Sequence, residues 1–236
     1  AEQGAIQILK DAWVLVEDGV IAQVGTGAAP ASADAKVVDA GGNLVTPGLV
    51  DAHTHLIFGG WRQNELGMKL HGKTYLEIQN AGGGIQSTTN ATRKATAEEL
   101  TQKAAKALDE MMGFGVTTCE AKSGYGLATE HELKALQVIQ NLNDRHPMDI
   151  VATFMGAHLV PAEYKQNRQE YIRLVCEEMI PAVQSRASPG SAMCSVRRTP
   201  SPWRSPARCW RPASSTACVP RSTPMRSRPL AAPFGR

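Results

Sequence analysis

Long apolar runs are missing from this sequence of 236 residues. None reaches the roughly 18 residues that a membrane-spanning helix needs. The chain also opens without the basic and apolar stretches of a secretory signal peptide. These two absences predict a cytoplasmic protein. The first residue is Ala1 rather than Met, in what reads as the middle of a strand pattern, so we expect that the start is missing.

Cysteine pairs of the kind that bind metals or form redox centres are also missing. None of the five cysteines forms a CxxC pair, and an odd number argues against a complete disulfide framework. Cys119 and Cys176 lie in apolar stretches, so we expect small buried side chains there rather than catalytic groups.

Acidic residues and lysine are absent from residues 185–236, which contain ten Arg, nine Pro and ten Ser. Residues 1–184 instead carry 15 Lys and Arg against 22 Asp and Glu. The net charge of +3 therefore averages two unlike segments, one at −7 and one at +10. The last segment has neither a helical nor a strand period, so a disordered tail or a basic RNA-binding tail is one interpretation of it.

Short strands are predicted for residues 1–46. The stretch AIQILKDAWVLVEDGVIAQVG has β-rich runs interrupted at Glu17-Asp18-Gly19, a turn signal that can close a hairpin. A second run, AKVVDAGGNLVTPG, follows a loop rich in Pro, Ala and Ser. We expect these runs to form a small sheet layer, part of a β-sandwich domain.

From residue 47 onward, strands alternate with helices. Thr96 is a good N-cap with Glu99 three residues later, and Gly113 or Gly115 ends the helix that follows. Such alternation implies βαβ units and a parallel sheet, and polar residues gather at the carboxyl end of each strand, as in a (β/α)₈ barrel. The predicted strands cover 44–58, 115–126 and 149–160, and the predicted helices cover 96–115, 129–146 and 171–183.

The strongest chemical signal is the motif PGLVDAHTH, with His53 and His55 at the end of a strand. Residues i and i+2 of a strand point to the same side, so two imidazoles there can hold one metal ion. A lone HxH pattern is weak, but one that ends an apolar strand after a small N-terminal sheet is far more specific. We therefore predict that His53 and His55 bind a metal.

The segment VTPGLVDAHTH resembles the first barrel strand of the amidohydrolase superfamily. Five further blocks, in order, resemble the imidazolonepropionase family of histidine degradation. The resemblance covers residues 1 to about 184. The blocks are HLIFGGWR, AGGGIQSTTNATR, GVTTCEAKSGYGL, TFMGAHLVP and YIRLVCEEMIPAV.

The resemblance implies a partial (β/α)₈ TIM barrel of the amidohydrolase type with a small N-terminal β-sandwich portion. In that family the matching histidines bind one zinc or iron ion, with a later His and a late Asp. The implied domains are residues 1–46 of the sandwich, 47–184 of the metal-dependent barrel, and 185–236 as a tail outside the family pattern.

The resemblance also implies substrate contacts. A planar guanidinium suits a carboxylate, so Arg62 would hold the propionate arm of the substrate. Tyr75 matches a substrate-contacting Tyr less securely, and packing at a helix edge is the alternative. Tyr125 follows Ser123-Gly124, where glycines let the backbone approach a ligand. His158 would contact the substrate ring or the developing oxyanion, which gives it a catalytic role.

The family also needs a His and an acid/base Glu in a later HADE block, and this chain shows neither. Residues 222–228, back-translated as TCC ACG CCG ATG AGA TCG AGG and read from the third base, give His-Ala-Asp-Glu-Ile-Glu. The same shift over residues 192–197, written GCG ATG TGT TCT GTG AGG, gives Asp-Val-Phe-Cys-Glu, the block expected on the fourth strand. We infer a one-frame slip between about Val183 and Ser188, which leaves a shifted tail.

The activity implied by the resemblance is hydrolysis of the cyclic amide of 4-imidazolone-5-propanoate to N-formimidoyl-L-glutamate. We expect a small-molecule substrate, no nucleic-acid or membrane partner, and a homodimer for the full-length protein. The alternatives are another cyclic amidohydrolase, of the hydantoinase or dihydroorotase type, or a non-catalytic fragment with a basic RNA-binding tail. This chain itself should be inactive, because the shifted tail lacks the acid/base Glu.

Overall fold

The computed structural model describes residues 6–30 and 35–186. Over these residues the chain divides between Pro47 and Gly48 into two compact units. Of the tail predicted at residues 185–236, Ser185 and Arg186 instead end a helix. Residues 187–236, with the inferred HADE block, lie outside the described residues. None of the described helices combines the length and the apolar character that crossing a membrane requires.

The first unit contains an antiparallel hairpin of β1 (Ala12–Glu17) and β2 (Val20–Thr26). Asp18 and Gly19 connect the strands, and both have a positive φ, 50° and 77°. Two consecutive residues of this kind are typical of a type I′ turn, whose twist matches that of the paired strands. The hairpin predicted at Glu17-Asp18-Gly19 is confirmed.

The second predicted strand run of this unit does not form, and that prediction is wrong. No residue between 35 and 48 is in a strand. A strand needs a neighbour for its backbone hydrogen bonds, and β1 and β2 pair only with each other among the described residues. Val37 and Val38 accordingly expose 85% and 80% of their surface.

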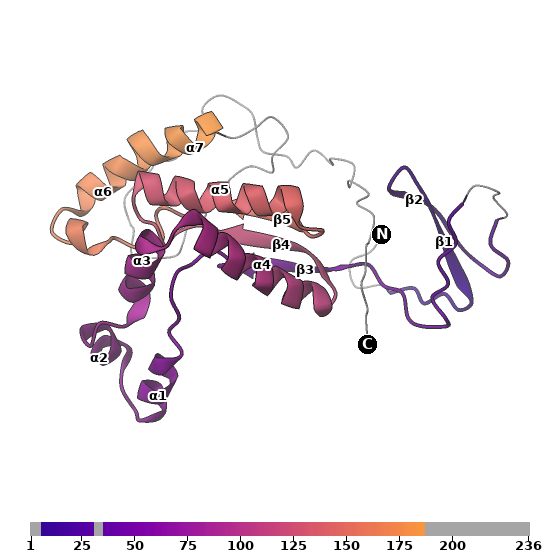
Figure 1. Ribbon diagram of the computed structural model, residues 1–236, viewed down its shortest axis with the longest axis horizontal. Helices are drawn as coiled ribbons and strands as arrows, with labels where there is room; N and C mark the ends of the chain where they lie inside the picture. The colour runs from indigo at the N-terminus through magenta and orange to yellow at the C-terminus, as the bar shows by residue number, and fades with distance from the viewer. Residues whose placement is uncertain (1–5, 31–34, 187–236) are drawn as a thin grey trace. The chain divides into compact units, whose positions relative to one another are not determined.

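A three-stranded parallel sheet forms the centre of the second unit (Figure 1). Its strands are β3 (Leu49–Thr54), β4 (Val116–Lys122) and β5 (Asp149–Thr153), side by side in that order. Helices α4 (Ala97–Gly113) and α5 (Thr129–Arg145) make the two crossovers and lie alongside the sheet. The prediction of βαβ units around a parallel sheet is confirmed, although each strand is shorter than its predicted run.

The caps of α4 match the prediction in detail. The Thr96 hydroxyl accepts a hydrogen bond from the Glu99 amide at 3.1 Å, and the Glu99 carboxylate accepts one from the Thr96 amide at 2.8 Å. This reciprocal capping box satisfies two amides that the helix leaves unpaired. The helix ends at Gly113, and Gly115, with φ 87°, turns the chain into β4.

The main core lies between these two helices and the sheet. Leu100, Ala104 and Leu108 of α4 recur every four residues, so they form one apolar face. Cys119 of β4 is fully buried in this core, as predicted, and burial raises the pKa of its thiol to about 11. Packing against the sheet from both helices fixes the strands, and therefore the loops at their carboxyl ends. The other buried members include Ala121, Ala135, Val138, Ile139, Leu142 and Ile150.

Three short helices between β3 and α4 were not predicted from the sequence. They are α1 (Asn64–Leu70), α2 (Tyr75–Asn80) and α3 (Gly84–Lys94), and they lie beyond the carboxyl end of β3 (Figure 1). The first two are too short to show a clear helical period, and the third begins at the last residue of a run of three glycines.

After β5 a short 3₁₀ turn (Ala162–Tyr164) precedes a continuous helical segment of α6 (Arg168–Leu174), a π-helical turn (Val175–Met179) and α7 (Ile180–Arg186). The helix predicted at 171–183 lies within this segment. Pro181 has no amide to donate to the preceding turn, which accounts for the π-helical irregularity beside it. The segment buries Tyr171, Val175, Met179 and Val183 against Leu127 and Phe154.

Candidate functional site

Three ring side chains from three successive strand ends form a cluster. His55 follows β3, Tyr125 follows β4 and His158 follows β5. The ring centroid of His55 lies 5.1 Å from those of both Tyr125 and His158, and the latter two are 5.6 Å apart. The carboxyl ends of adjacent parallel strands share one edge of the sheet, which is where ligands bind in such folds. The structure therefore brings together three residues that the sequence singled out.

His53 lies beside this cluster, with its ring centroid 5.8 Å from that of His55. The pairing of β3 with β4 shifts register between Asp51 and Thr54. The simple alternation expected from the sequence is therefore interrupted, and His53 is exposed while His55 is partly buried. Two imidazoles that share one zinc ion have ring centres roughly 5–6 Å apart, given Zn–N bonds of ~2.1 Å, so this pair can still hold one ion.

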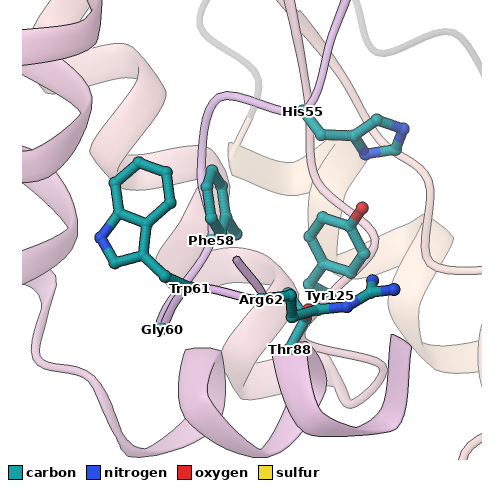
Figure 2. Close-up of a pocket in the computed structure, with 7 residues that line it drawn as sticks. All are labelled: His55, Phe58, Gly60, Trp61, Arg62, Thr88 and Tyr125. Carbon is teal, nitrogen blue, oxygen red and sulfur yellow. The ribbon is translucent and has the colours of Figure 1, made fainter. Parts of the chain in front are cut away.

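A cavity of about 220 Å³ opens next to His55 (Figure 2). It combines an apolar wall, an imidazole and a guanidinium, which is the usual composition of a site for a small ligand with one anionic group. Figure 2 shows the Arg62 side chain extending beside the Tyr125 ring. The lining residues are His55, Phe58, Gly60, Trp61, Arg62, Thr88 and Tyr125.

The apolar wall is anchored to α4 by a lysine. The Lys103 ammonium donates hydrogen bonds to the carbonyl oxygens of Phe58, at 3.1 Å, and Gly60, at 2.6 Å. It also lies 3.4 Å and 4.0 Å from the ring centroids of Phe58 and Trp61. Burial lowers the pKa of Lys103 to about 8, whereas the two aromatic faces favour its charged form. These contacts hold the loop that leads to Arg62 against α4.

Arg62 pairs with a buried carboxylate. Its Nε and Nη2 atoms each donate to Glu65 at 2.8 Å, in a two-point ion pair. The Glu65 hydrogen bond is the main cause that raises the pKa of Arg62, so the guanidinium is always charged. A permanent cation on the wall of this cavity suits a ligand carboxylate.

Tyr75, also predicted to contact substrate, is the first residue of α2 and is half exposed. It is not among the residues that line the cavity, but its hydroxyl lies close to Gly84, at the start of α3. The structure thus places it at the end of a helix near the site, and its predicted contact with substrate stays a prediction.

A fully buried carboxylate holds the loop that carries Tyr125. Glu132 accepts hydrogen bonds from the amides of Gly124, Gly126 and Leu127, at 3.0, 2.8 and 2.7 Å, and from the Ser123 hydroxyl. Burial raises the pKa of Glu132, while these four donors act in the opposite direction. With so many donors directed at it, one side chain determines the path of the whole loop.

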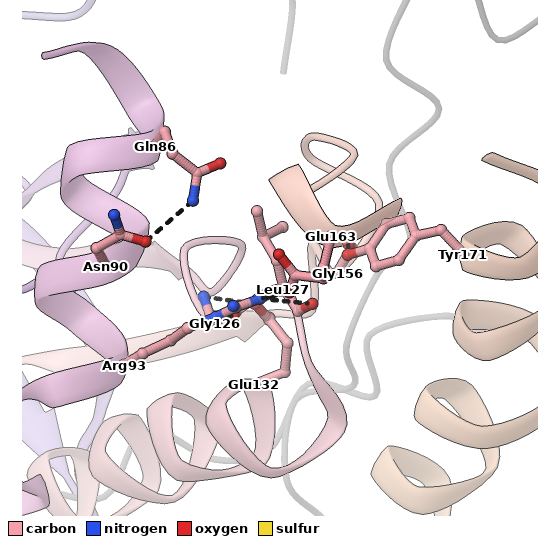
Figure 3. Close-up of polar contacts among 9 residues, drawn as sticks. All are labelled: Gln86, Asn90, Arg93, Gly126, Leu127, Glu132, Gly156, Glu163 and Tyr171. Carbon is pink, nitrogen blue, oxygen red and sulfur yellow. Dashed lines mark hydrogen bonds and ion pairs between the residues drawn. The ribbon is translucent and has the colours of Figure 1, made fainter. Parts of the chain in front are cut away.

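Arg93 of α3 also binds this loop (Figure 3). Its guanidinium donates to the carbonyls of Gly126, at 2.7 Å, and Leu127, at 3.3 Å, and pairs with Glu163 at 2.6 Å. The loop also approaches His158 closely, because a Cβ on Gly124 would lie only 3.1 Å from the His158 Cβ. Glycine is needed at position 124 for this contact. Its φ of 110° also requires glycine, because other residues rarely adopt this conformation.

The histidines of the cluster are neutral. Burial, followed by the charges of His158 and Lys122, lowers the pKa of His55 to about 4. Burial also lowers the pKa of His158. Lys122 is fully buried at the end of β4 and pairs with Glu120, which also accepts a hydrogen bond from the Thr153 hydroxyl at 2.7 Å. A neutral imidazole is the form that ligates a metal.

The residues present fit a metal in part. The Nδ1 atoms of His55 and His158 are buried and have no hydrogen-bond partner among the described residues. An unpartnered buried ring nitrogen is costly unless something binds it, and a metal ion or a ligand would do so. The described ranges contain no group of three or more His, Cys, Asp or Glu able to hold an ion. The imidazoles of His53 and His55 alone are fewer than the three protein ligands that a catalytic zinc usually has.

Several residues of the site were missed by sequence reasoning. Phe58 and Trp61 lie within the FGGWR block, where the apolar side chains could have indicated a wall. Glu65 lies three residues after Arg62, a spacing typical of a helical ion pair. Thr88 gave no local signal, because the other residues that line the cavity lie in distant parts of the chain. Glu132 accepts hydrogen bonds from residues five to eight positions earlier, a spacing that matches neither a helical nor a strand period.

Comparison with known proteins identifies the relatives of this chain. The amidohydrolase family matches residues 36–74. The imidazolonepropionase of Brevibacillus brevis is 53% identical over 192 residues, covering 79% of this chain and 45% of that protein. Those of Treponema denticola and Geobacillus kaustophilus are 54% and 51% identical over 177 and 185 residues. They cover 74% and 76% of this chain and 43% and 44% of their own lengths. The chain thus spans slightly less than half of each relative.

Proposed function

Because this chain belongs to the imidazolonepropionases of the amidohydrolase family, we propose that the complete protein hydrolyses 4-imidazolone-5-propanoate to N-formimidoyl-L-glutamate. It is a hydrolase acting on the cyclic amide C–N bond of this small molecule in histidine degradation. The chain spans less than half of its relatives, so the activity is assigned to the protein as a whole.

The observation that carries the proposal is the position of Arg62. Its guanidinium lines the same cavity as His55 and Tyr125, so a carboxylate held by Arg62 brings the attached ring toward the imidazole cluster. Arg62 would hold the propionate, and Phe58 and Trp61 would cover the apolar part of the substrate. A hydantoin or a dihydroorotate lacks this flexible propionate arm, which counts against those substrates.

The ring of the substrate would lie against Tyr125 and His158. Burial raises the pKa of Tyr125, so its hydroxyl keeps its proton and can donate it in a hydrogen bond. A neutral His158 can donate from one ring nitrogen to the ring carbonyl oxygen and to the oxyanion that develops there. Its Nδ1 atom has no partner among the described residues, which leaves it free to accept from a substrate N–H. Tyr75, at the start of α2, would make a further substrate contact.

His53 and His55 would hold one metal ion, zinc or iron. The ion, when bound, supplies Lewis-acid chemistry that activates water and polarises a carbonyl. The later His ligand and the acid/base Glu would come from the sequence that the shifted reading frame encodes. Holding His55 neutral through burial is the contribution of the described residues to this site.

The complete fold is also a proposal. We infer a (β/α)₈ barrel that begins near residue 47, since β3, β4 and β5 pair in chain order, as successive barrel strands do. Residues 1–46 would belong to a small β-sandwich domain, and residues 185–236 would be a frameshifted tail. A cytoplasmic location and a homodimeric full-length protein stay predictions.

The experiment is an activity assay on the protein with its reading frame restored beyond codon 188. Zinc or ferrous iron is supplied, and ring opening of 4-imidazolone-5-propanoate is compared with that of hydantoin and dihydroorotate. We expect a clear preference for the imidazolone. A preference for either other ring would assign the protein to another cyclic amidohydrolase type. Salt-dependent RNA binding by residues 185–236 would instead support the RNA-binding alternative.

A further inference from the structure

Glu65 lies at the junction of three segments around the cavity. Its carboxylate is buried, with 4% of the residue exposed, and its two oxygens accept from Arg62 at 2.8 Å each. The Oε1 atom also accepts from the amide of Gly84, at 2.6 Å. Gly84 begins α3, and α3 carries Thr88, which lines the cavity. A single carboxylate therefore connects the Arg62 loop to the helix on another wall.

This contact explains the glycines at the start of α3. A Cβ on Gly83 would lie 2.8 Å from the Glu65 Oε1 atom, closer than side-chain atoms normally approach. Gly84 has a φ of 73°, a conformation that other residues rarely adopt. The two glycines let the backbone reach the Glu65 carboxylate. This contact gives a reason for the AGGGI motif, which has no role in the proposed function.

We propose that Glu65 is a positioning residue that orients Arg62 for a ligand carboxylate and couples this orientation to the start of α3. The inference rests on the proposed function, in which Arg62 binds the propionate of the substrate. Glu65 itself does not line the cavity and need not touch the substrate.

The geometry of the guanidinium supports this role. Glu65 occupies the Nε–Nη2 edge of Arg62, so the Nη1–Nη2 edge remains for a second carboxylate. A planar guanidinium that is held along one edge presents its other edge in a single orientation. The hydrogen bond with Arg62 is the main cause that lowers the pKa of Glu65, and the bond from the Gly84 amide adds to it. Burial acts in the opposite direction but is outweighed, so the side chain stays charged.

Simple electrostatics predicts the opposite effect of Glu65 on binding. A carboxylate next to Arg62 reduces the attraction of that cation for another anion, so its removal should tighten the binding of an anionic ligand. Positioning predicts that removal weakens binding, because Arg62 loses its orientation. The sign of the change therefore separates the two roles.

The experiment uses the 236-residue chain, since every residue of this network lies within it. The probes are 3-(imidazol-4-yl)propanoate and 4-propylimidazole, which lacks the carboxylate, and binding is measured by calorimetry. We expect Glu65→Gln to weaken binding of the propanoate probe roughly tenfold, about 1.4 kcal/mol. Binding of the neutral probe should be almost unchanged. Glu65→Asp keeps the charge but is too short to reach both Arg62 and Gly84, so it should weaken the propanoate probe as well.

Glu98→Gln is the matched control, because Glu98 is an exposed glutamate in the first turn of α4. It should change neither affinity. Unchanged or tighter binding of the propanoate probe by Glu65→Gln would overturn the proposal, and so would an equal loss of both probes, which indicates a structural role only. If Glu65→Gln does not fold, as judged by circular dichroism, Glu65→Asp decides by the same criteria.

An NMR measurement on the same chains does not depend on a ligand. The Nε–H proton of Arg62, assigned from its loss in Arg62→Lys, should exchange slowly with water in the original chain and rapidly in Glu65→Gln. Equal exchange in both would overturn the positioning role. If the original chain binds neither probe while the exchange rates differ as expected, the proposed ligand class fails and the orientation of Arg62 by Glu65 stands.

Discussion

His55 and His158 lie with their ring centroids 5.1 Å apart, although β4 separates the two strands that precede them. Tyr125, at the end of β4, contacts both rings. The cluster therefore depends on the order of three strands in one sheet and on the loops that follow them. Changes in the residues that hold these loops should alter the site even where they touch no ligand.

Replacement of Arg62 by methionine should mainly weaken substrate binding. The variant loses a charge-assisted two-point contact with a carboxylate, which costs about 2–4 kcal/mol in comparable pairs. We expect a raised KM and a lowered kcat/KM in the frame-restored protein, measured by steady-state kinetics. Unchanged values of both would remove Arg62 from the substrate site.

Replacement of Glu132 by alanine should destabilise the chain. Four donors that now point at one carboxylate would lose their acceptor, and leaving such groups buried costs about 2–5 kcal/mol. Urea unfolding followed by circular dichroism measures the free energy of unfolding. Glu163→Gln is the control, since this more exposed partner of Arg93 should change stability by less than about 1 kcal/mol. Similar losses in the two variants would show that Glu132 has no special role in holding the Tyr125 loop.

The 236-residue chain should bind zinc only weakly. A catalytic zinc usually has three protein ligands and water, and the proposed pair supplies two imidazoles. Competition against a chelating dye should show weak binding that His55→Ala abolishes. His71→Ala is the control, because this exposed histidine at the end of α1 should not matter. Tight binding that survives His55→Ala would place the ion elsewhere.

The 236-residue chain should also lack the ring-opening activity. Residues 185–236 contain no acid and no histidine, so that stretch offers no carboxylate or imidazole to carry protons near neutral pH. The purified chain, supplied with zinc or ferrous iron, is assayed beside the frame-restored protein. Comparable turnover by the two would show that other residues replace the missing groups.

The nucleotide sequence of the gene should encode the missing residues in another frame. Beyond codon 188, the frame that starts at the third base of each codon should read His-Ala-Asp-Glu at codons 222–226. Met225 has a single codon, and it falls where the shifted reading needs it, as does that of Met193 in the earlier block. Sequencing of the gene tests this directly, and codons that exclude His-Ala-Asp-Glu in every frame would refute the slip.

Local sequence alone determined the features that depend on near neighbours in the chain. The Asp18-Gly19 turn, the Thr96–Glu99 capping box and the alternation of strands with helices were all predicted, because each arises from contacts within a few residues. The family motifs also indicated His55, Arg62, Tyr125 and His158, and the structure places the side chains of these four close together.

Only the tertiary structure decided which distant groups hold those side chains in place. Glu65 reaches Gly84, and Lys103 reaches the carbonyls of Phe58 and Gly60. No local sequence pattern predicts these contacts, because the partners of each charged side chain are backbone groups that only the fold brings close to it. Residues 35–48 did not form the predicted strands for the same reason, since a strand also needs a neighbouring strand to supply its hydrogen bonds.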